Sequence, residues 1–218
     1  RPNIAHQGLF PYDCLNGWGF RPDSYWGTFE FYGQVNLMKG AVNNADAVTT
    51  VSPSYSWDIQ TRDGGFGLDG VMAANKQKLH GILNGIDYDV WNPRTDALIP
   101  AHYSADDTEG KKGCRRALME KFGWNDDGRP LVIFVGRLTE QKGIDIMLDA
   151  LARFMPDRIY ALIIGSGNDM FNRRLEDFRA AHAASVRTVP GFRAAAAHPA
   201  SPGGALLRRP PLFDPRRL

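Results

Sequence analysis

Residues 130–143 have the sequence PLVIFVGRLTEQKG, in which five consecutive apolar residues lead into a loop that contains glycine and two cations. Apolar residues then recur at helical spacing over residues 144–154, and a second continuous apolar run follows at 159–165. A strand, a helix and a strand in this order, with strands apolar on both faces, are typical of a parallel βαβ unit. The spacing also predicts a helix at 169–181 and a strand at 186–189. The expected fold class is therefore α/β with a doubly wound sheet.

The loop after the first of these strands is a candidate anion site. Sheets of this class bind ligands at the carboxyl ends of their strands, where the next helix offers backbone N–H groups. Arg137 and Lys142 follow Gly136 in this loop, and a bidentate arginine with a mobile lysine suits a diphosphate. The alternative is that both are solvated loop cations. A second glycine-bearing turn, GSGN at residues 165–168, indicates either close approach of a ligand or an ordinary tight turn.

The part of the chain before residue 88 has a different pattern. Residues 1–33 are rich in Gly, Pro and aromatic side chains without a sustained period, which predicts a loop-rich segment. A helix is expected at 35–42, and short strands at 45–51 and 78–83. The glycines of residues 64–71 predict a flexible loop. Asn84-Gly85 then closes the second strand, either as a turn or as a ligand contact.

Composition excludes several classes of protein. The chain has 218 residues, 43% of them hydrophobic, and a net charge of +2 that argues against a dedicated nucleic-acid binder. Apolar runs are of strand length, so no membrane span is expected. Cys14 and Cys114 lie far apart without metal-binding spacing, which predicts neither a disulfide scaffold nor a zinc site. Because the chain begins with Arg1, we expect it to be part of a longer protein.

The charge is unevenly distributed. Residues 1–180 hold 20 Lys and Arg against 23 Asp and Glu, whereas residues 181–218 hold six Arg against one Asp. The final stretch is also rich in Ala and Pro and has no clear period. Such a composition is not typical of the next part of a doubly wound domain. We therefore expect residues 193–218 to be an aberrant or disordered tail, such as a shift of reading frame would produce.

Several segments together resemble one enzyme family. The chain is similar to the bacterial glycogen synthases and plant starch synthases, which are ADP-glucose-dependent retaining glucosyltransferases. The resemblance rests on NIAHQGLF at 3–10, ADAVTTVSP at 45–53, FGLDG at 66–70, HGILNGID at 80–87, WNP at 91–93 and VGRLTEQKG at 135–143. It implies the GT-B architecture of two Rossmann-like domains, both incomplete here, with ADP-glucose as donor and an α-1,4-glucan as acceptor.

The resemblance also implies roles for individual residues. Arg137 and Lys142 match the pair that neutralises the ADP diphosphate as the glucosyl bond breaks, next to Gly136, and Asn84 matches an asparagine of the donor site. The family's histidine near the transferred glucose corresponds to Pro2, so no catalytic residue is assigned. The family's Lys-x-Gly-Gly and Glu-Pro-Cys-Gly segments are not recognised in this sequence. No cofactor or metal is implied, and we expect the 218-residue chain alone to be inactive.

The expected organisation has four parts. Residues 1–87 form the end of an acceptor-side domain, 88–128 a connector with one helix at 111–122, 129–192 the start of a nucleotide-sugar-binding domain, and 193–218 the tail. The expected location is the cytoplasm of a bacterium, or a plastid if the source is a plant. Two alternatives stay open. One is an inactive remnant that at most binds nucleotide sugar or glucan, and the other is a GT-B enzyme that uses a UDP-sugar.

Overall fold

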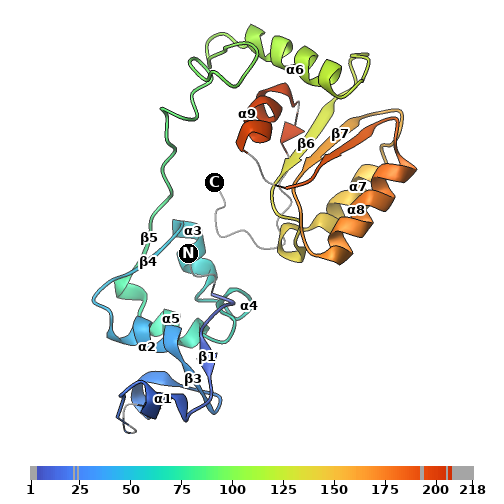
Figure 1. The fold of residues 1–218 in the computed structure, drawn as a ribbon. Coiled ribbons are helices and arrows are strands. Elements are labelled where there is room, and N and C mark those ends of the chain that lie inside the picture. The colour runs from blue at the N-terminus through green and yellow to red at the C-terminus, as the bar shows by residue number, and fades with distance from the viewer. Residues whose placement is uncertain (1–3, 22, 24, 192–193, 205, 208–218) are drawn as a thin grey trace. The chain divides into compact units, whose positions relative to one another are not determined.

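A computed structural model describes residues 4–21, 23, 25–191, 194–204 and 206–207 of the chain. The chain divides into two compact units (Figure 1). One unit runs up to Gly85 and the other begins at Ile86, where the sequence predicts a boundary after residue 87.

The first unit is built from short elements around two small sheets. An antiparallel sheet has the order β1-β3-β2, and β4 pairs with β5 in parallel. Its elements are β1 (Leu9–Phe10), α1 (Cys14–Gly17), η1 (Tyr25–Phe29), β2 (Glu30–Phe31), β3 (Gln34–Asn36), α2 (Leu37–Asn44), β4 (Val48–Thr50), α3 (Pro53–Asp58), α4 (Arg62–Gly65), α5 (Asp69–Ala74), η2 (Lys76–Lys78) and β5 (Leu79–Gly81). The expected helix and the two expected strands are confirmed as α2, β4 and β5.

The prediction of a flexible loop at residues 64–71 is wrong, because α4 and α5 occupy most of it. The Thr61 hydroxyl caps α4 by accepting from the Gly64 N–H at 3.2 Å. A Cβ at Gly64 would lie 2.2 Å from the Asp58 carbonyl oxygen, and one at Gly65 would lie 2.9 Å from that of Ile59. These glycines therefore permit close packing of backbone against backbone, which composition alone does not distinguish from flexibility.

The second unit contains a parallel sheet with the strand order β8-β7-β6-β9. Leu131 pairs with Tyr160 and the register continues to Val135 and Ile164. Its elements are α6 (Glu109–Lys121), β6 (Leu131–Val135), η3 (Glu140–Lys142), α7 (Ile144–Ala152), β7 (Tyr160–Ile164), α8 (Asp169–Ala181), β8 (Val186–Val189), α9 (Ala194–Gly203) and β9 (Leu206–Leu207). The predicted βαβ unit, the helix after it and the third strand are confirmed.

Helices cover both faces of this sheet (Figure 1). Val132 and Phe134 of β6 pack with the apolar faces of α7 and α8. Leu131 and Ile133 face the opposite way, into a second cluster that includes Leu118 of α6. Every residue of β6 and β7 is buried. The continuous apolar runs of the sequence therefore correspond to central strands buried on both faces.

The structure differs from the expectation of a connector followed by a disordered tail. Helix α6 lies on the sheet, and α9 packs against α6 within residues expected to be aberrant. Ala200 is fully buried, and a Cβ at Gly203 would lie 2.9 Å from Leu118 Cδ2. Small side chains thus allow α9 to approach closely, and β9 adds a parallel strand to β6. The second sheet face needs a helical cover, and these two helices supply it.

Gly204→Val is expected to lower the free energy of unfolding of the second unit by about 1–3 kcal/mol, because its side chain overpacks the core. A Cβ at Gly204 would lie 2.7 Å from Ile133 Cδ1. Urea unfolding measures the change in the free energy of unfolding, and hydrogen exchange of the β6 amides shows whether the change lies in the second unit. Gly70→Val is the control, since nothing lies within 4 Å of a Cβ there. Equal stability of the two variants would mean that this end of the chain is not part of the folded unit.

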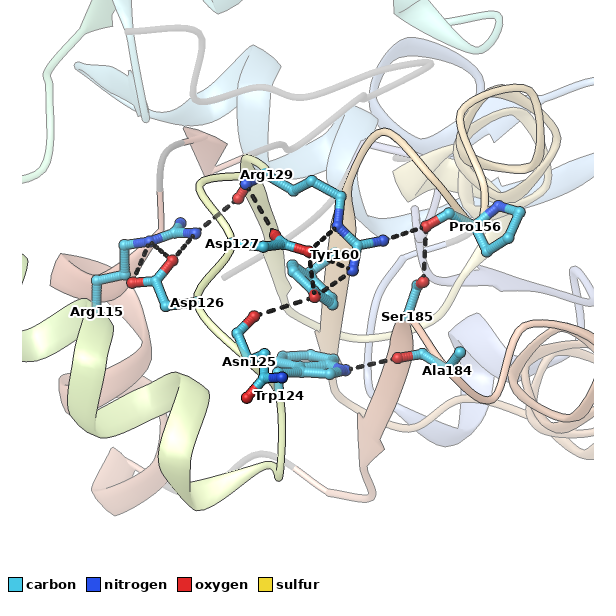
Figure 2. A network of polar contacts seen from close by, with 10 residues as sticks. All are labelled: Arg115, Trp124, Asn125, Asp126, Asp127, Arg129, Pro156, Tyr160, Ala184 and Ser185. Carbon is cyan, nitrogen blue, oxygen red and sulfur yellow. Dashed lines mark hydrogen bonds and ion pairs between the residues drawn. The ribbon is translucent and has the colours of Figure 1, made fainter.

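A polar network closes the second unit at the amino ends of β6 and β7 (Figure 2). Arg129 donates to Asp127 Oδ2 at 2.8 Å and to the Pro156 carbonyl at 2.6 Å, and it also donates to the Tyr160 hydroxyl. The Tyr160 hydroxyl is 3.1 Å from the Asn125 carbonyl oxygen. The guanidinium also lies over the Tyr160 ring, 4.0 Å from its centroid. The network joins the loop after α6 to the first residue of β7.

A second ion pair extends this network to α6. Arg115 Nη2 lies 2.7 Å from Asp126 Oδ1 and donates to the Arg129 carbonyl at 2.6 Å. Trp124 lies between Arg115 and Asp126 in the sequence, and it donates its indole N–H to the Ala184 carbonyl at 3.0 Å (Figure 2). The side chains of the 124–129 loop therefore hold α6 to the sheet rather than leaving it as a free linker.

The network predicts a loss of stability in acid. The hydrogen bond from Arg129 lowers the pKa of Asp127 to about 2, against a smaller rise from burial. A carboxyl whose pKa is depressed on folding stabilises the protein above its unfolded pKa, and this contribution is lost as pH falls from about 4 toward 2. We expect the stability difference between the wild type and Asp127→Asn to shrink over that range. Urea unfolding at pH 7, 4 and 2.5 measures it, and a constant difference would contradict the assignment.

Candidate functional site

Two loops lie side by side at the carboxyl ends of β6 and β7. The hydrogen-bond ladder continues past the strands, because Gly136 N donates to the Ile164 carbonyl at 3.0 Å and Leu138 N donates to the Ser166 carbonyl at 2.9 Å. Leu138 and Gly167 then form an isolated parallel bridge. The turn that contains the predicted cations is therefore held in register with the turn of the neighbouring strand.

Glycine is required where the two loops meet. A Cβ at Gly165 would lie 1.9 Å from the Gly136 carbonyl oxygen, and one at Gly167 would lie 2.0 Å from the Leu138 carbonyl oxygen. Real Cβ atoms do not approach backbone oxygens this closely. The glycines of the second turn thus serve the contact between the loops. The sequence alone left them ambiguous between a ligand contact and a tight turn.

A buried leucine fixes the direction of the cation next to it. Leu138 is fully buried in the core against α7 and α8, while Arg137, one residue before it, is exposed. The chain then forms the short helix η3 and enters α7 through Gly143, which has a left-handed φ of +60° and is buried. Lys142 is half-buried at the end of η3. The loop therefore presents one exposed and one half-buried cation beside a helix N-terminus.

The N-terminus of α7 is suited to an anion. Gly143 at its N-cap position has no side chain that could accept from the first backbone N–H groups, and the first turn contains the acidic Asp145. Helix α8 differs, because the Asn168 side chain accepts from Phe171 N at 3.0 Å and Asn172 accepts from Gly167 N at 2.9 Å. The uncapped turn and its macrodipole attract negative charge, and the two nearby cations strengthen that attraction.

The structure brings together three of the four predicted binding residues, Gly136, Arg137 and Lys142, within one loop of the second unit. Asn84 lies in the first unit, three residues after β5, where its side chain is exposed. Pro2, for which the resemblance implies the position of the family's histidine, lies outside the described residues. Leu138 and Gly143 position the loop, and their role was not predicted, because nothing in the local sequence distinguishes them from ordinary loop residues.

Within the described ranges, no three His, Cys, Asp or Glu side chains come together as metal ligands. Of the helices that the structure describes, none has the length and apolar character needed to cross a membrane.

The chain is similar in sequence to known glycogen and starch synthases. Residues 3–74 match the model of the starch synthase catalytic domain. The chain is 42% identical over 216 residues to a glycogen synthase from Paracidovorax citrulli and 37% identical over 227 residues to the chloroplastic/amyloplastic soluble starch synthase 1 of Oryza sativa. Each alignment covers 98% of this chain but only 42% and 35% of those relatives. The chain therefore spans less than half of their length.

A solved structure agrees with these relatives. The catalytic domain of starch synthase IV from Arabidopsis thaliana, bound to ADP and acarbose, matches with a TM-score of 0.87 at 30% identity, covering 98% of this chain and 45% of that one. Sucrose-phosphate synthase from Thermosynechococcus elongatus shares the fold at a TM-score of 0.52 and 16% identity. The predicted GT-B fold class is confirmed. By sequence over nearly its whole length, and by fold, the chain is similar to glycogen and starch synthases.

Proposed function

We propose that this chain carries the diphosphate-binding loop of a retaining glucosyltransferase that moves glucose from ADP-glucose to the non-reducing end of an α-1,4-glucan. The observation that supports it most is the uncapped N-terminus of α7, which has Arg137 and Lys142 in the loop before it. A relative with ADP and acarbose bound supports the choice of nucleotide and glucan. In a bacterium this reaction belongs in the cytoplasm and serves glycogen synthesis, and in a plant it belongs in the plastid.

The geometry suits the departure of a diphosphate. When the glucosyl bond breaks, negative charge develops on the leaving ADP. Donors fixed in advance stabilise that charge most, because they need no reorganisation at the moment of reaction. The loop between β6 and α7 is fixed in this way by the buried Leu138 and by its ladder to the next loop. Arg137 offers a bidentate contact, and Lys142 a point charge. Asn84 is proposed as a further donor-site contact.

Replacement of the two cations tests this proposal. Arg137→Ala and Lys142→Ala are each expected to weaken ADP binding to the chain about 10- to 100-fold, which is the loss of one charged hydrogen bond. Isothermal titration calorimetry measures the affinity. Arg153→Ala, an exposed arginine in the same unit at the other end of α7, is the matched control. Equal affinity of all three variants for ADP would contradict the proposal.

The alternatives predict different results in the same experiment. A UDP-sugar enzyme would bind UDP more tightly than ADP. The expectation that this 218-residue chain is inactive alone is checked by incorporation of labelled glucose from ADP-glucose into glycogen. ADP binding without incorporation is the expected result. Robust incorporation would contradict the expected inactivity but not the assigned reaction.

A further inference from the structure

The segment that begins the second unit folds back on itself before α6. All residues between β5 and α6 are described, and none of them belongs to a helix or a strand. Asp96 N donates to the Asn92 carbonyl at 2.8 Å, and Tyr103 N donates to the Pro93 carbonyl at 3.0 Å. Residues 91–104, which we call the strap, therefore form a closed loop. Because ordering a loop costs conformational entropy that a few backbone hydrogen bonds do not offset, the strap depends on contacts with the helices beside it.

Helix α6 holds one end of the strap. The Cys114 thiol donates to the Ala101 carbonyl at 3.1 Å. A Cβ at Gly110 would lie 1.9 Å from the His102 carbonyl oxygen. One at Gly113 would lie 3.0 Å from the Ala101 Cβ. Because glycine allows the strap to approach the helix this closely, this end of the strap lies directly on α6.

Helix α9 holds the earlier part of the strap through one side chain. His198 Nδ1 lies 2.6 Å from Asp96 Oδ2, and the two side chains are 3% and 10% exposed. The other carboxyl oxygen, Asp96 Oδ1, accepts from Leu98 N at 2.8 Å. Trp91 stacks on the His198 ring with centroids 3.8 Å apart and an interplanar angle of 17°. A single residue of α9 therefore contacts the strap at two places.

The contact between His198 and Asp96 is difficult to break while both stay buried. A carboxyl group that loses its hydrogen-bond partner in a buried place is strongly destabilised unless water replaces that partner. Asp96 is too enclosed for water to replace His198 without movement of the strap away from α9. We therefore expect loss of the His198 side chain to release the strap up to the residues that α6 holds.

The chain is least constrained just before the strap. Ile82 N donates to the Thr50 carbonyl at 2.8 Å, which continues the pairing of β5 with β4 by one residue. Trp91 N donates to the Asp87 carbonyl at 2.8 Å, so a turn begins at Asp87. Residues 83–86 lie between these two hydrogen bonds, and all of them are exposed. Within the part of the chain that the structure describes, they make no hydrogen bond.

We propose that α9 is a latch that fixes the strap to the second unit through His198, so that the joint of the chain between the two units is restricted to residues 83–86. The latch goes beyond the proposed function, because it would exist whether or not the chain binds a nucleotide. Without the latch, the chain would be unconstrained from residue 83 almost to Ala101, where the contacts with α6 begin. A short joint allows the chain fewer conformations than a long one. Asn84 lies within this joint, so neither core fixes its position.

The alternative is that α9 only covers the sheet. Ala200 is buried in the cluster on that face, and Gly203 lies against Leu118 of α6. These contacts involve the opposite partners of α9, and they do not need His198. If covering the sheet were the whole role of α9, the strap would be held by α6 alone. The two roles therefore differ in whether the strap and α9 open together.

Native-state hydrogen exchange of the full 218-residue chain tests the latch on the unaltered protein. The amides of Asp96 and Tyr103 report on the strap. Those of Ala200 and Ser201 report on α9. We expect both pairs to show the same free energy of opening and the same dependence on low concentrations of urea, and we expect residues 83–86 to exchange as fast as an unfolded chain. Different opening free energies for the strap and α9 would overturn the latch, and slow exchange at residues 83–86 would overturn the joint.

Variants test the same contact directly. His198→Ala is expected to speed exchange of the Tyr103 amide about 10- to 100-fold, which corresponds to the loss of one hydrogen bond to a charged group. His80→Ala removes an exposed histidine of the first unit, and as the matched control it is expected to leave that amide unchanged. Equal exchange at Tyr103 in the two variants would overturn the latch. The β6 amides check that the sheet stays folded, and if His198→Ala unfolds it, the measurement on the unaltered chain decides.

A double-variant cycle separates the contact from the rest of α9. Because His198 and Asp96 act through each other, adding His198→Ala to Asp96→Ala is expected to speed exchange of the Tyr103 amide less than twofold further. If the two changes instead multiplied their separate effects on that amide, His198 would not hold the strap through Asp96, and the latch would be overturned.

Discussion

Gly167→Ala is expected to weaken ADP binding to the chain about 10- to 100-fold, because the displaced loop no longer places the charge of Arg137 on the diphosphate. The new Cβ would lie 2.0 Å from the Leu138 carbonyl oxygen, and that oxygen belongs to backbone that cannot rotate away. The loop that carries Arg137 must then move from its neighbour. Overpacking of this kind also costs about 1–3 kcal/mol of stability. Calorimetry with ADP and urea unfolding measure the two effects.

A second glycine of the same site supplies the control for folding. At Gly136 a Cβ would lie 3.4 Å from Phe134 Cζ, which is near ordinary van der Waals contact. Gly136→Ala is therefore expected to keep stability within about 0.5 kcal/mol of the wild type. If Gly167→Ala matched it in stability, the two loops would not depend on their close contact.

The sequence predicted the middle of the second unit well because its signals there are local. The apolar runs that became β6 and β7 are buried on both faces, so each residue of the run supports the same conclusion. The helix at 169–181 has the same bounds in the structure, since Asn168 caps its first turn. The loop after β6 that carries Arg137 and Lys142 was predictable for the same reason. A strand followed by glycine and two cations specifies it within 14 residues.

Contacts between distant residues account for what the sequence did not predict. Residues 194–204 lack apolar periodicity, yet α9 packs on α6, where Ala200 is buried and Gly203 leaves room for Leu118. Small residues give no hydrophobic periodicity, so the sequence of this stretch resembled that of a disordered tail. Likewise, nothing near Trp91 predicts a stack on His198, which lies more than a hundred residues away. Such a pairing exists only after the sheet has brought the two segments together.

The Tyr160 side chain is expected to be the most sensitive position at the amino ends of the strands. It is 2% exposed, its hydroxyl accepts from Arg129, and its ring lies under the guanidinium. Tyr160→Phe removes the hydroxyl and leaves Arg129 with one partner fewer, at an expected cost of about 1–3 kcal/mol in the free energy of unfolding. Tyr160→Ala also opens a cavity, for a total of about 3–5 kcal/mol. Hydrogen exchange of the β7 amides measures both.

The difference in the free energy of unfolding between Tyr160→Phe and Tyr160→Ala separates the contribution of the hydroxyl from that of the ring. Tyr88→Phe is the control, since Tyr88 is 71% exposed, and it is expected to change stability by less than about 0.5 kcal/mol. If Tyr160→Phe were as harmless, the network of Figure 2 would add little beyond the packing of the ring. The expected loss instead implies that the 124–129 loop holds α6 against the sheet. Because α9 packs on α6, weakening this end of the strands would also loosen α9.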